Sequence, residues 1–127
     1  AQDKQGRAVY HTNVLMCIGS DFVIAGFEMM TDAKRRDEII RRFEFAGKKV
    51  IHLTEAQIGA FCGNALELHA GSKRLLALSS TAFAALSQSQ KALLEQSVTL
   101  VPLDVSAIEL AGGSVRCMLA GIHLSKR

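Results

Sequence analysis

The sequence of 127 residues has little of what marks a membrane or secreted protein. It contains one proline, no tryptophan and only 6% aromatic residues, and its longest apolar stretches, such as 14–18 and 75–78, are short. A membrane-spanning helix needs roughly 18 to 20 apolar residues, so we expect no membrane partner. Residues 1–7 are polar and charged and lack the apolar centre of a secretory signal. We therefore expect a cytoplasmic location.

Motifs for metals, nucleotides and disulfides are also missing. The three cysteines are an odd number without a C-x-x-C pair, which predicts free thiols. No two histidines have metal-ligand spacing on one element, and neither G-x-G-x-x-G nor G-x-x-x-x-G-K-[ST] occurs. The sequence therefore predicts no metal site and no cofactor.

The composition that is present, 49% hydrophobic and 21% charged, is typical of a globular domain, and we treat 1–127 as one. Its net charge is +3, and the basic residues are densest in 34–49, where acidic residues are interleaved with them. No aromatic ladder accompanies this segment, so it indicates a solvated helix face and no nucleic-acid partner.

Apolar runs and turn residues predict an α/β fold. Strands are expected at 9–16, 22–29 and 50–53, with a helix that begins after Thr31 or Asp32 and ends at Gly47. Thr54 and Gln57 form a capping box for a short helix at 55–61.

The same order then starts again. Strands are expected at 64–69, 74–78 and 98–101, the last closed by Pro102, and a helical region at 81–96 is interrupted by a capping box at Ser87 and Gln90. A hairpin at 114–124 follows. The chain thus divides into strand-strand-helix-strand repeats at about 9–61 and 62–110, with closing strands at 112–124. A period of roughly 50 residues is typical of propellers and solenoids.

Three short segments match in register across these repeats. Residues 12–15, 63–66 and 116–119 each place a small or polar side chain before an apolar pair. If the units surround an axis, Asn13, Asn64 and Cys117 occupy equivalent places near it.

Two residues stand out as candidates for chemistry. Gly112 and Gly113 let the backbone approach another group closely just before Cys117, and a cysteine is nucleophilic as a thiolate. His11 lies in a polar cluster, 10–13, that precedes an apolar strand. By themselves, both residues also fit ordinary structural roles. Cys17 and Cys62 lie in apolar surroundings and are expected to be buried.

The strings at 10–19, 61–67 and 112–118 closely resemble the arginine-deiminase-related branch of the amidinotransferase superfamily, which includes citrulline hydrolases. They occur in the expected order, and the resemblance extends from Val9 to Lys126. It implies a pentein fold, a five-unit α/β propeller, of which this chain resembles the C-terminal portion. It also implies that Cys117 is the nucleophile and His11 the general acid and base of a hydrolase that cleaves a C–N bond through a covalent intermediate.

Asn13 departs from the arginine deiminase pattern, which has an aspartate there. An amide can donate to a ureido oxygen, so Asn13 favours a ureido substrate such as citrulline, and Asn64 is a second candidate for binding substrate. A non-catalytic pentein binding module and an amidinotransferase are the alternatives. Complete enzymes of this type are more than twice as long, so we expect the chain to need an N-terminal half, a partner chain or self-association, and to be inactive as a monomer.

Overall fold

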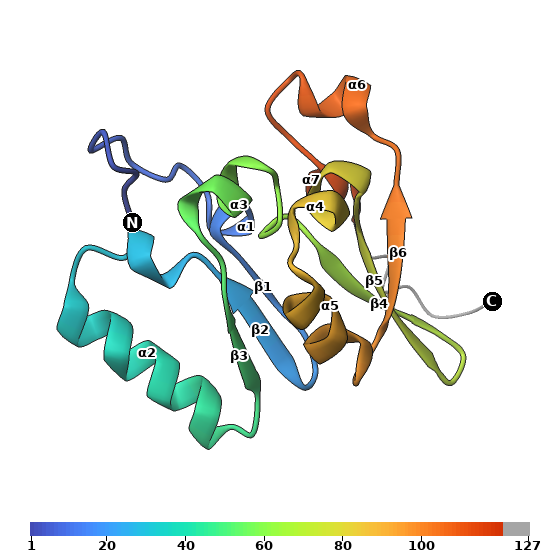
Figure 1. Ribbon diagram of the computed structural model, residues 1–127, viewed down its shortest axis with the longest axis horizontal. Coiled ribbons are helices and arrows are strands. Elements are labelled where there is room, and N and C mark those ends of the chain that lie inside the picture. The colour runs from blue at the N-terminus through green and yellow to red at the C-terminus, as the bar shows by residue number, and fades with distance from the viewer. Residues whose placement is uncertain (121–127) are drawn as a thin grey trace.

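The computed structural model describes residues 1–120 (Figure 1). Its strands are β1 Met16–Ile18, β2 Phe22–Ala25, β3 Lys49–His52, β4 Leu66–Ala70, β5 Lys73–Ser79 and β6 Thr99–Leu103. Its helices are α1 Thr12–Leu15, the 3-10 turn η1 Phe27–Met29, α2 Ala33–Phe45, α3 Glu55–Gly59, α4 Ser80–Ala85, α5 Gln88–Glu95, α6 Ser106–Glu109 and α7 Val115–Met118.

The strands form two three-stranded sheets with the same topology. In the first, β2 pairs antiparallel with β1 and parallel with β3. In the second, β5 pairs antiparallel with β4 and parallel with β6. The predicted α/β class and the repeated strand-strand-helix-strand order are therefore confirmed. The two sheets are separate, and residues 1–120 form no closed ring.

The elements are arranged in alternating layers. From left to right, Figure 1 shows α2, the β1-β2-β3 sheet, the pair α4 and α5, and the β4-β5-β6 sheet. Side chains join α5 to the first sheet, because Gln90 Nε2 donates to the His52 carbonyl at 2.7 Å and Lys49 Nζ donates to Gln96 Oε1 at 2.8 Å. The helices of the second repeat thus cover the sheet of the first.

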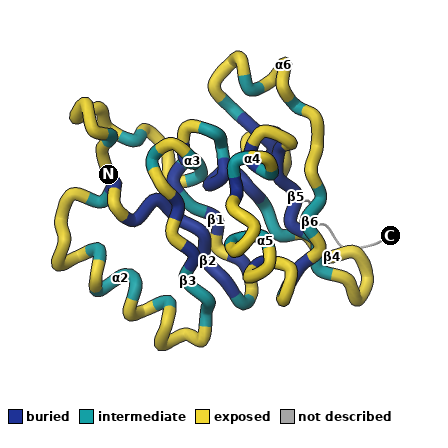
Figure 2. Tube along the Cα trace, viewed as in Figure 1, coloured by how far each residue is buried: buried dark blue, intermediate teal, exposed yellow. Residues whose placement is uncertain are grey.

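The core follows this layering (Figure 2). All four residues of β2 are buried, and they alternate between two clusters. Phe22 and Ile24 join the main cluster, which includes Leu76, Leu78 and Leu94 of the second repeat. Val23 and Ala25 join a smaller cluster beneath α2. A strand covered on both faces reads as a continuous apolar run, which explains the sequence Phe-Val-Ile-Ala.

Helix α2 has the predicted solvated face. Asp32 caps it by accepting from the Arg35 backbone N–H at 2.9 Å, and no residue of the helix is fully buried. Glu38 accepts from Arg35 and Arg42, each at 2.6 Å, on the outer side. The basic segment thus neutralises part of its charge within the helix.

Both predicted capping boxes are present. Thr54 and Gln57 cap α3, and Ser87 and Gln90 cap α5. The two boxes also touch, since Gln57 Nε2 donates to Gln90 Oε1 at 2.7 Å and to the Ala85 carbonyl at 3.0 Å. Local signals for helix starts therefore contribute to the contact between the repeats.

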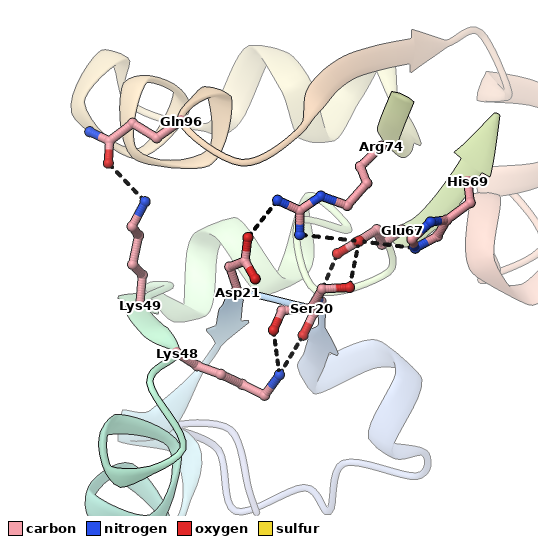
Figure 3. A network of polar contacts seen from close by, with 9 residues as sticks. Ser20, Asp21, Lys48, Lys49, Glu67, His69, Arg74 and Gln96 are labelled. Carbon is pink, nitrogen blue, oxygen red and sulfur yellow. Dashed lines mark hydrogen bonds and ion pairs between the residues drawn. The ribbon is translucent and has the colours of Figure 1, made fainter. Parts of the chain in front are cut away.

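A polar network joins the β1–β2 turn to the second sheet (Figure 3). The Glu67 carboxylate accepts from the Ser20 backbone N–H at 2.7 Å and from Ser20 Oγ at 2.8 Å. Arg74 forms an ion pair with Asp21, and Lys48 Nζ donates to the Gly19 carbonyl at 2.8 Å. The Arg74 hydrogen bond holds the pKa of Asp21 below its usual value.

Four sequence predictions need correction. The expected strand at 22–29 ends at Ala25 as β2, and Phe27–Met29 form the 3-10 turn η1, because the Met30 N–H bonds to the Phe27 carbonyl. The expected strand at 9–16 is a one-turn helix, α1, followed by a strand that starts only at Met16, because His11 caps the backbone there. Pro102 does not close a strand but lies within β6. Among residues 1–120, β6 pairs with β5 alone, so the missing N–H can face away from the ladder.

The fourth correction concerns the closing strands at 112–124. Residues 115–118 form helix α7, because the Cys117 N–H bonds locally to the Ser114 carbonyl at 3.0 Å and the Arg116 N–H bonds to the Asn64 carbonyl at 3.3 Å. Residues 121–124 of that prediction lie outside the described part of the chain. Within residues 1–120, no helix is both long and apolar enough to span a bilayer.

Candidate active site

Cys117 lies in the single turn of α7, and its side chain is exposed. The preceding glycines shape its surroundings. Gly112 has a φ of +88°, which favours glycine, and a Cβ added at Gly113 would lie 3.4 Å from Cys117 Cβ and 3.9 Å from Sγ. The glycine pair therefore turns the backbone into α7 and leaves space beside the thiol.

Asn64 lies against Cys117 and is only 1% exposed. Its Nδ2 group donates to Cys117 Sγ at 3.1 Å and to the Asn13 carbonyl at 2.9 Å, while its Oδ1 accepts weakly from the Cys117 N–H at 3.4 Å. One buried amide thus contacts both the backbone and the sulfur of the candidate nucleophile.

Gly63 allows this arrangement. A Cβ at Gly63 would lie 2.5 Å from the Val14 carbonyl oxygen, which is closer than real contacts. Only glycine lets the backbone before β4 approach α1 so closely, and this approach places Asn64 beside Asn13.

His11 begins the same short helix α1. Its Nδ1 accepts from the Asn13 backbone N–H at 3.2 Å, so the neutral imidazole carries its proton on Nε2. The neighbouring Tyr10 hydroxyl donates to the Gly112 carbonyl at 3.0 Å. The segment that carries His11 is thus held against the loop that leads to Cys117.

The structure therefore brings the four residues singled out in the sequence into one region. Successive hydrogen bonds run from His11 through Asn13 and Asn64 to Cys117. Asn64 is the buried member of this group, and its side chain contacts Asn13 and Cys117.

Comparison with known proteins identifies the family. The sequence model of the family described as N,N dimethylarginine dimethylhydrolase, eukaryotic, matches residues 1–124. The chain belongs to this dimethylarginine dimethylhydrolase family. The predicted relation to the pentein and amidinotransferase superfamily is thereby confirmed. A search of curated proteins found no match.

A solved structure supports the fold of this family member. The apo structure of ArgZ, an arginine dihydrolase from the ornithine-ammonia cycle in cyanobacteria, matches with a TM-score of 0.65 and 18% identity. The match covers 91% of this chain and 16% of ArgZ. At this identity the likeness shows the fold alone.

The other two thiols of this dimethylarginine dimethylhydrolase family member, Cys17 and Cys62, have a different environment from that of Cys117. Cys17 and Cys62 are both 0% exposed, which confirms the expectation from the sequence. Burial raises the pKa of Cys17 to about 11 and that of Cys62 to about 12. Both are therefore neutral near pH 7, whereas the Cys117 thiol is open to solvent and receives an N–H donor.

Two residues near the site, Tyr10 and Glu109, have roles that the local sequence does not predict. Tyr10 belongs to the polar cluster 10–13, and its hydroxyl donates to the Gly112 carbonyl across 102 positions. Glu109 bonds to Ser114, which precedes α7, at 2.8 Å. No local pattern distinguishes Glu109 from other surface acids, because its partners come together only in the folded chain.

Proposed function

We propose that the protein hydrolyses a non-peptide C–N bond of a guanidino or ureido amino acid through a covalent intermediate on Cys117. Membership of the dimethylarginine dimethylhydrolase family supports a hydrolase of this class. The observation that carries the proposal is the 3.1 Å contact from Asn64 Nδ2 to Cys117 Sγ, joined through Asn13 to His11.

The first step uses these groups as follows. The Asn64 Nδ2 group points at the sulfur that attacks and can donate a hydrogen bond to it throughout the reaction. The thiolate forms a C–S bond to the central guanidino or ureido carbon. His11, in its imidazolium form for this step, donates its Nε2 proton to the departing nitrogen. The C–N bond breaks, the electron pair leaves with a neutral amine, and His11 is left as a neutral imidazole.

The second step restores the enzyme. His11, now able to accept a proton, takes one from a water molecule that attacks the same carbon. The C–S bond then breaks, and the electron pair returns to Cys117 as thiolate. A guanidino substrate thus becomes a ureido product and an amine, and no cofactor is needed to balance the reaction.

Asn13 bears on the choice between guanidino and ureido substrates. Its backbone is used by His11 and Asn64, and it is half-buried at the start of α1. Its side-chain amide can donate to a ureido oxygen and accept from a guanidino N–H, whereas a carboxylate can only accept. The family description and ArgZ both name arginine-type substrates, so arginine, dimethylarginine and citrulline are the compounds to compare.

The test is turnover by the full-length protein with each of these three compounds. We expect release of ammonia or an alkylamine, and an acid quench should leave a substrate-derived mass on the peptide that contains Cys117. Cys117→Ser should abolish both signals, and His11→Ala should lower the rate by roughly 100-fold or more. Cys17→Ala, which alters a buried thiol away from the proposed chemistry, serves as the control.

The proposal fails if none of the compounds turns over, or if Cys117→Ser keeps the full rate. Turnover that requires an added amine acceptor would instead support an amidinotransferase. Binding of a compound without turnover or a covalent adduct would support a binding module.

A further inference from the structure

The carboxylate of Glu109, at the end of α6, gathers hydroxyl groups from two separate parts of the chain. Thr81 Oγ1, in α4, donates to Glu109 Oε2 at 2.7 Å. Ser114 Oγ, immediately before α7, donates to Glu109 Oε1 at 2.8 Å. The Glu109 side chain therefore connects Ser114, directly before the helix α7 that carries Cys117, to α4, the helix that follows β5.

Glu109 is suited to this role as an anion. Partial burial raises the pKa of its carboxyl, but hydrogen bonds from Ser79, Thr81 and Ser114 lower it more, so the net pKa lies below the usual value. An ionised carboxylate accepts hydrogen bonds and cannot donate. Each hydroxyl must therefore point its proton at Glu109, which fixes the orientation of the Ser114 side chain.

Ser114 shows why α7 needs this support. A serine at a helix N-cap usually accepts from a backbone N–H of the first turn. Ser114 makes no such side-chain bond, and it is 0% exposed. The hydroxyl is committed to Glu109 instead. Because a four-residue helix has almost no stability of its own, the position of α7 depends on such tertiary contacts.

We propose that Glu109 is a positioning residue for Cys117: through Ser114 it holds α7 where Cys117 Sγ stays within reach of Asn64 Nδ2. Its importance for turnover rests on the proposed function, in which Cys117 is the nucleophile. The placement of the thiol is a property that can be measured without any substrate.

The first test measures the rate at which iodoacetamide labels Cys117 in the full-length protein, by mass spectrometry at pH 7. Glu109→Ala should slow this reaction about tenfold, because the sulfur loses a hydrogen bond to its charged form. Ser114→Ala should reproduce the effect. Asp104→Asn is the matched control, since Asp104 is a nearby acid whose carboxylate accepts from the Ser106 N–H, and its labelling rate should equal that of the wild type.

The second test separates positioning from general stability. If Glu109 acts through the contact between Asn64 and Cys117, then Glu109→Ala should change the labelling rate less than twofold when Asn64→Ala is already present. A loss of overall stability would instead slow or speed labelling equally in both backgrounds. Glu109→Gln keeps the shape of the side chain and should show an effect in the same direction, about threefold, if Glu109→Ala does not fold.

These results are independent of whether the protein is the proposed hydrolase. If none of the substrates is turned over, the proposed function is wrong. The labelling rates of Cys117 would still test the role of Glu109. Labelling of Cys117 at the wild-type rate in folded Glu109→Ala or Glu109→Gln would overturn the inference, as would equal effects in the two Asn64 backgrounds. If turnover is observed, kcat should fall in Glu109→Ala while KM changes little.

Discussion

The two sheets share one topology but differ in how they are covered. In the first sheet every residue of β2 is buried, because α2 covers one face and the helices of the second repeat cover the other. In the second sheet β5 is buried only from Leu76 to Ser79, and β4 is exposed from Leu68 onward. Helix α7 contacts β5. Cys117 thus lies at the incompletely covered sheet, while the first sheet contributes more of the core.

This difference separates stability from reactivity. Substitutions in the first sheet should unfold the chain without a specific effect on Cys117. Substitutions around α7 should change the reactivity of the thiol more than the stability of the fold.

The largest expected effect on stability is in the first sheet. Ile24→Ala should lower the free energy of unfolding by about 2–5 kcal/mol, because it opens a cavity in the main cluster. Leu68→Ala, on the second sheet and 39% exposed, should cost less than about 1 kcal/mol. Urea denaturation of both variants measures the difference, and equal losses would contradict the comparison.

The approach of α1 to the second sheet should be the next most sensitive feature. Gly63→Ala would place a methyl group 2.5 Å from the Val14 carbonyl and should cost roughly 1–3 kcal/mol as the backbone shifts. Gly59→Ala is the matched control, since nothing lies within 4 Å of its added Cβ and alanine favours the helix by about 1 kcal/mol. A stable Gly63→Ala protein would show that the site tolerates a wider separation.

The two capping boxes offer an internal comparison between the repeats. Thr54→Ala and Ser87→Ala should each lower the free energy of unfolding by about 1 kcal/mol. Because Gln57 and Gln90 touch, the double variant should lose less than the sum of the two single variants. Strict additivity in thermal or urea unfolding would indicate that the boxes act independently.

The smallest expected effect concerns the junction in Figure 3. In the folded chain Arg74 lowers the pKa of Asp21, and the charges of Lys49 and Lys48 lower it further. The ion pair therefore stabilises the fold at pH values above the usual carboxyl pKa. This stabilisation is lost as the pH falls through the folded pKa of Asp21. Asp21→Asn should therefore melt at a lower temperature than the wild type at pH 7. The two melting curves should converge as the pH falls below 3.8. A constant difference at all pH values would exclude the ion pair as its cause.

Features fixed by neighbouring residues were predictable from the sequence. Asp32 and the two capping boxes mark helix starts through contacts three residues away, and the structure has them as expected. Helices α1 and α7 were missed. Besides the local cap at His11 and the local bond to Ser114, both have partners far along the chain. Asn64 supplies backbone or side-chain contacts to both Asn13 and Cys117, which lie more than 50 positions from it.

The candidate site also has features that could be predicted from the sequence and one contact that could not. Cys117 and His11 were found because the strings that contain them resemble a known family, and the grouping of Asn13, Asn64 and Cys117 followed from the repeat. The contact between Asn64 and the sulfur could not be predicted, since it requires the burial of Asn64 that only the fold produces.

The most direct test of the account is the order in which the three thiols react with iodoacetamide while turnover is followed. Cys17 and Cys62 are buried and have raised pKa values, whereas Cys117 is exposed beside an N–H donor. In the full-length protein we expect Cys117 to be labelled first, with turnover lost in proportion to its labelling. Loss of turnover that follows Cys17 or Cys62, or full turnover after complete labelling of Cys117, would contradict its role as the nucleophile.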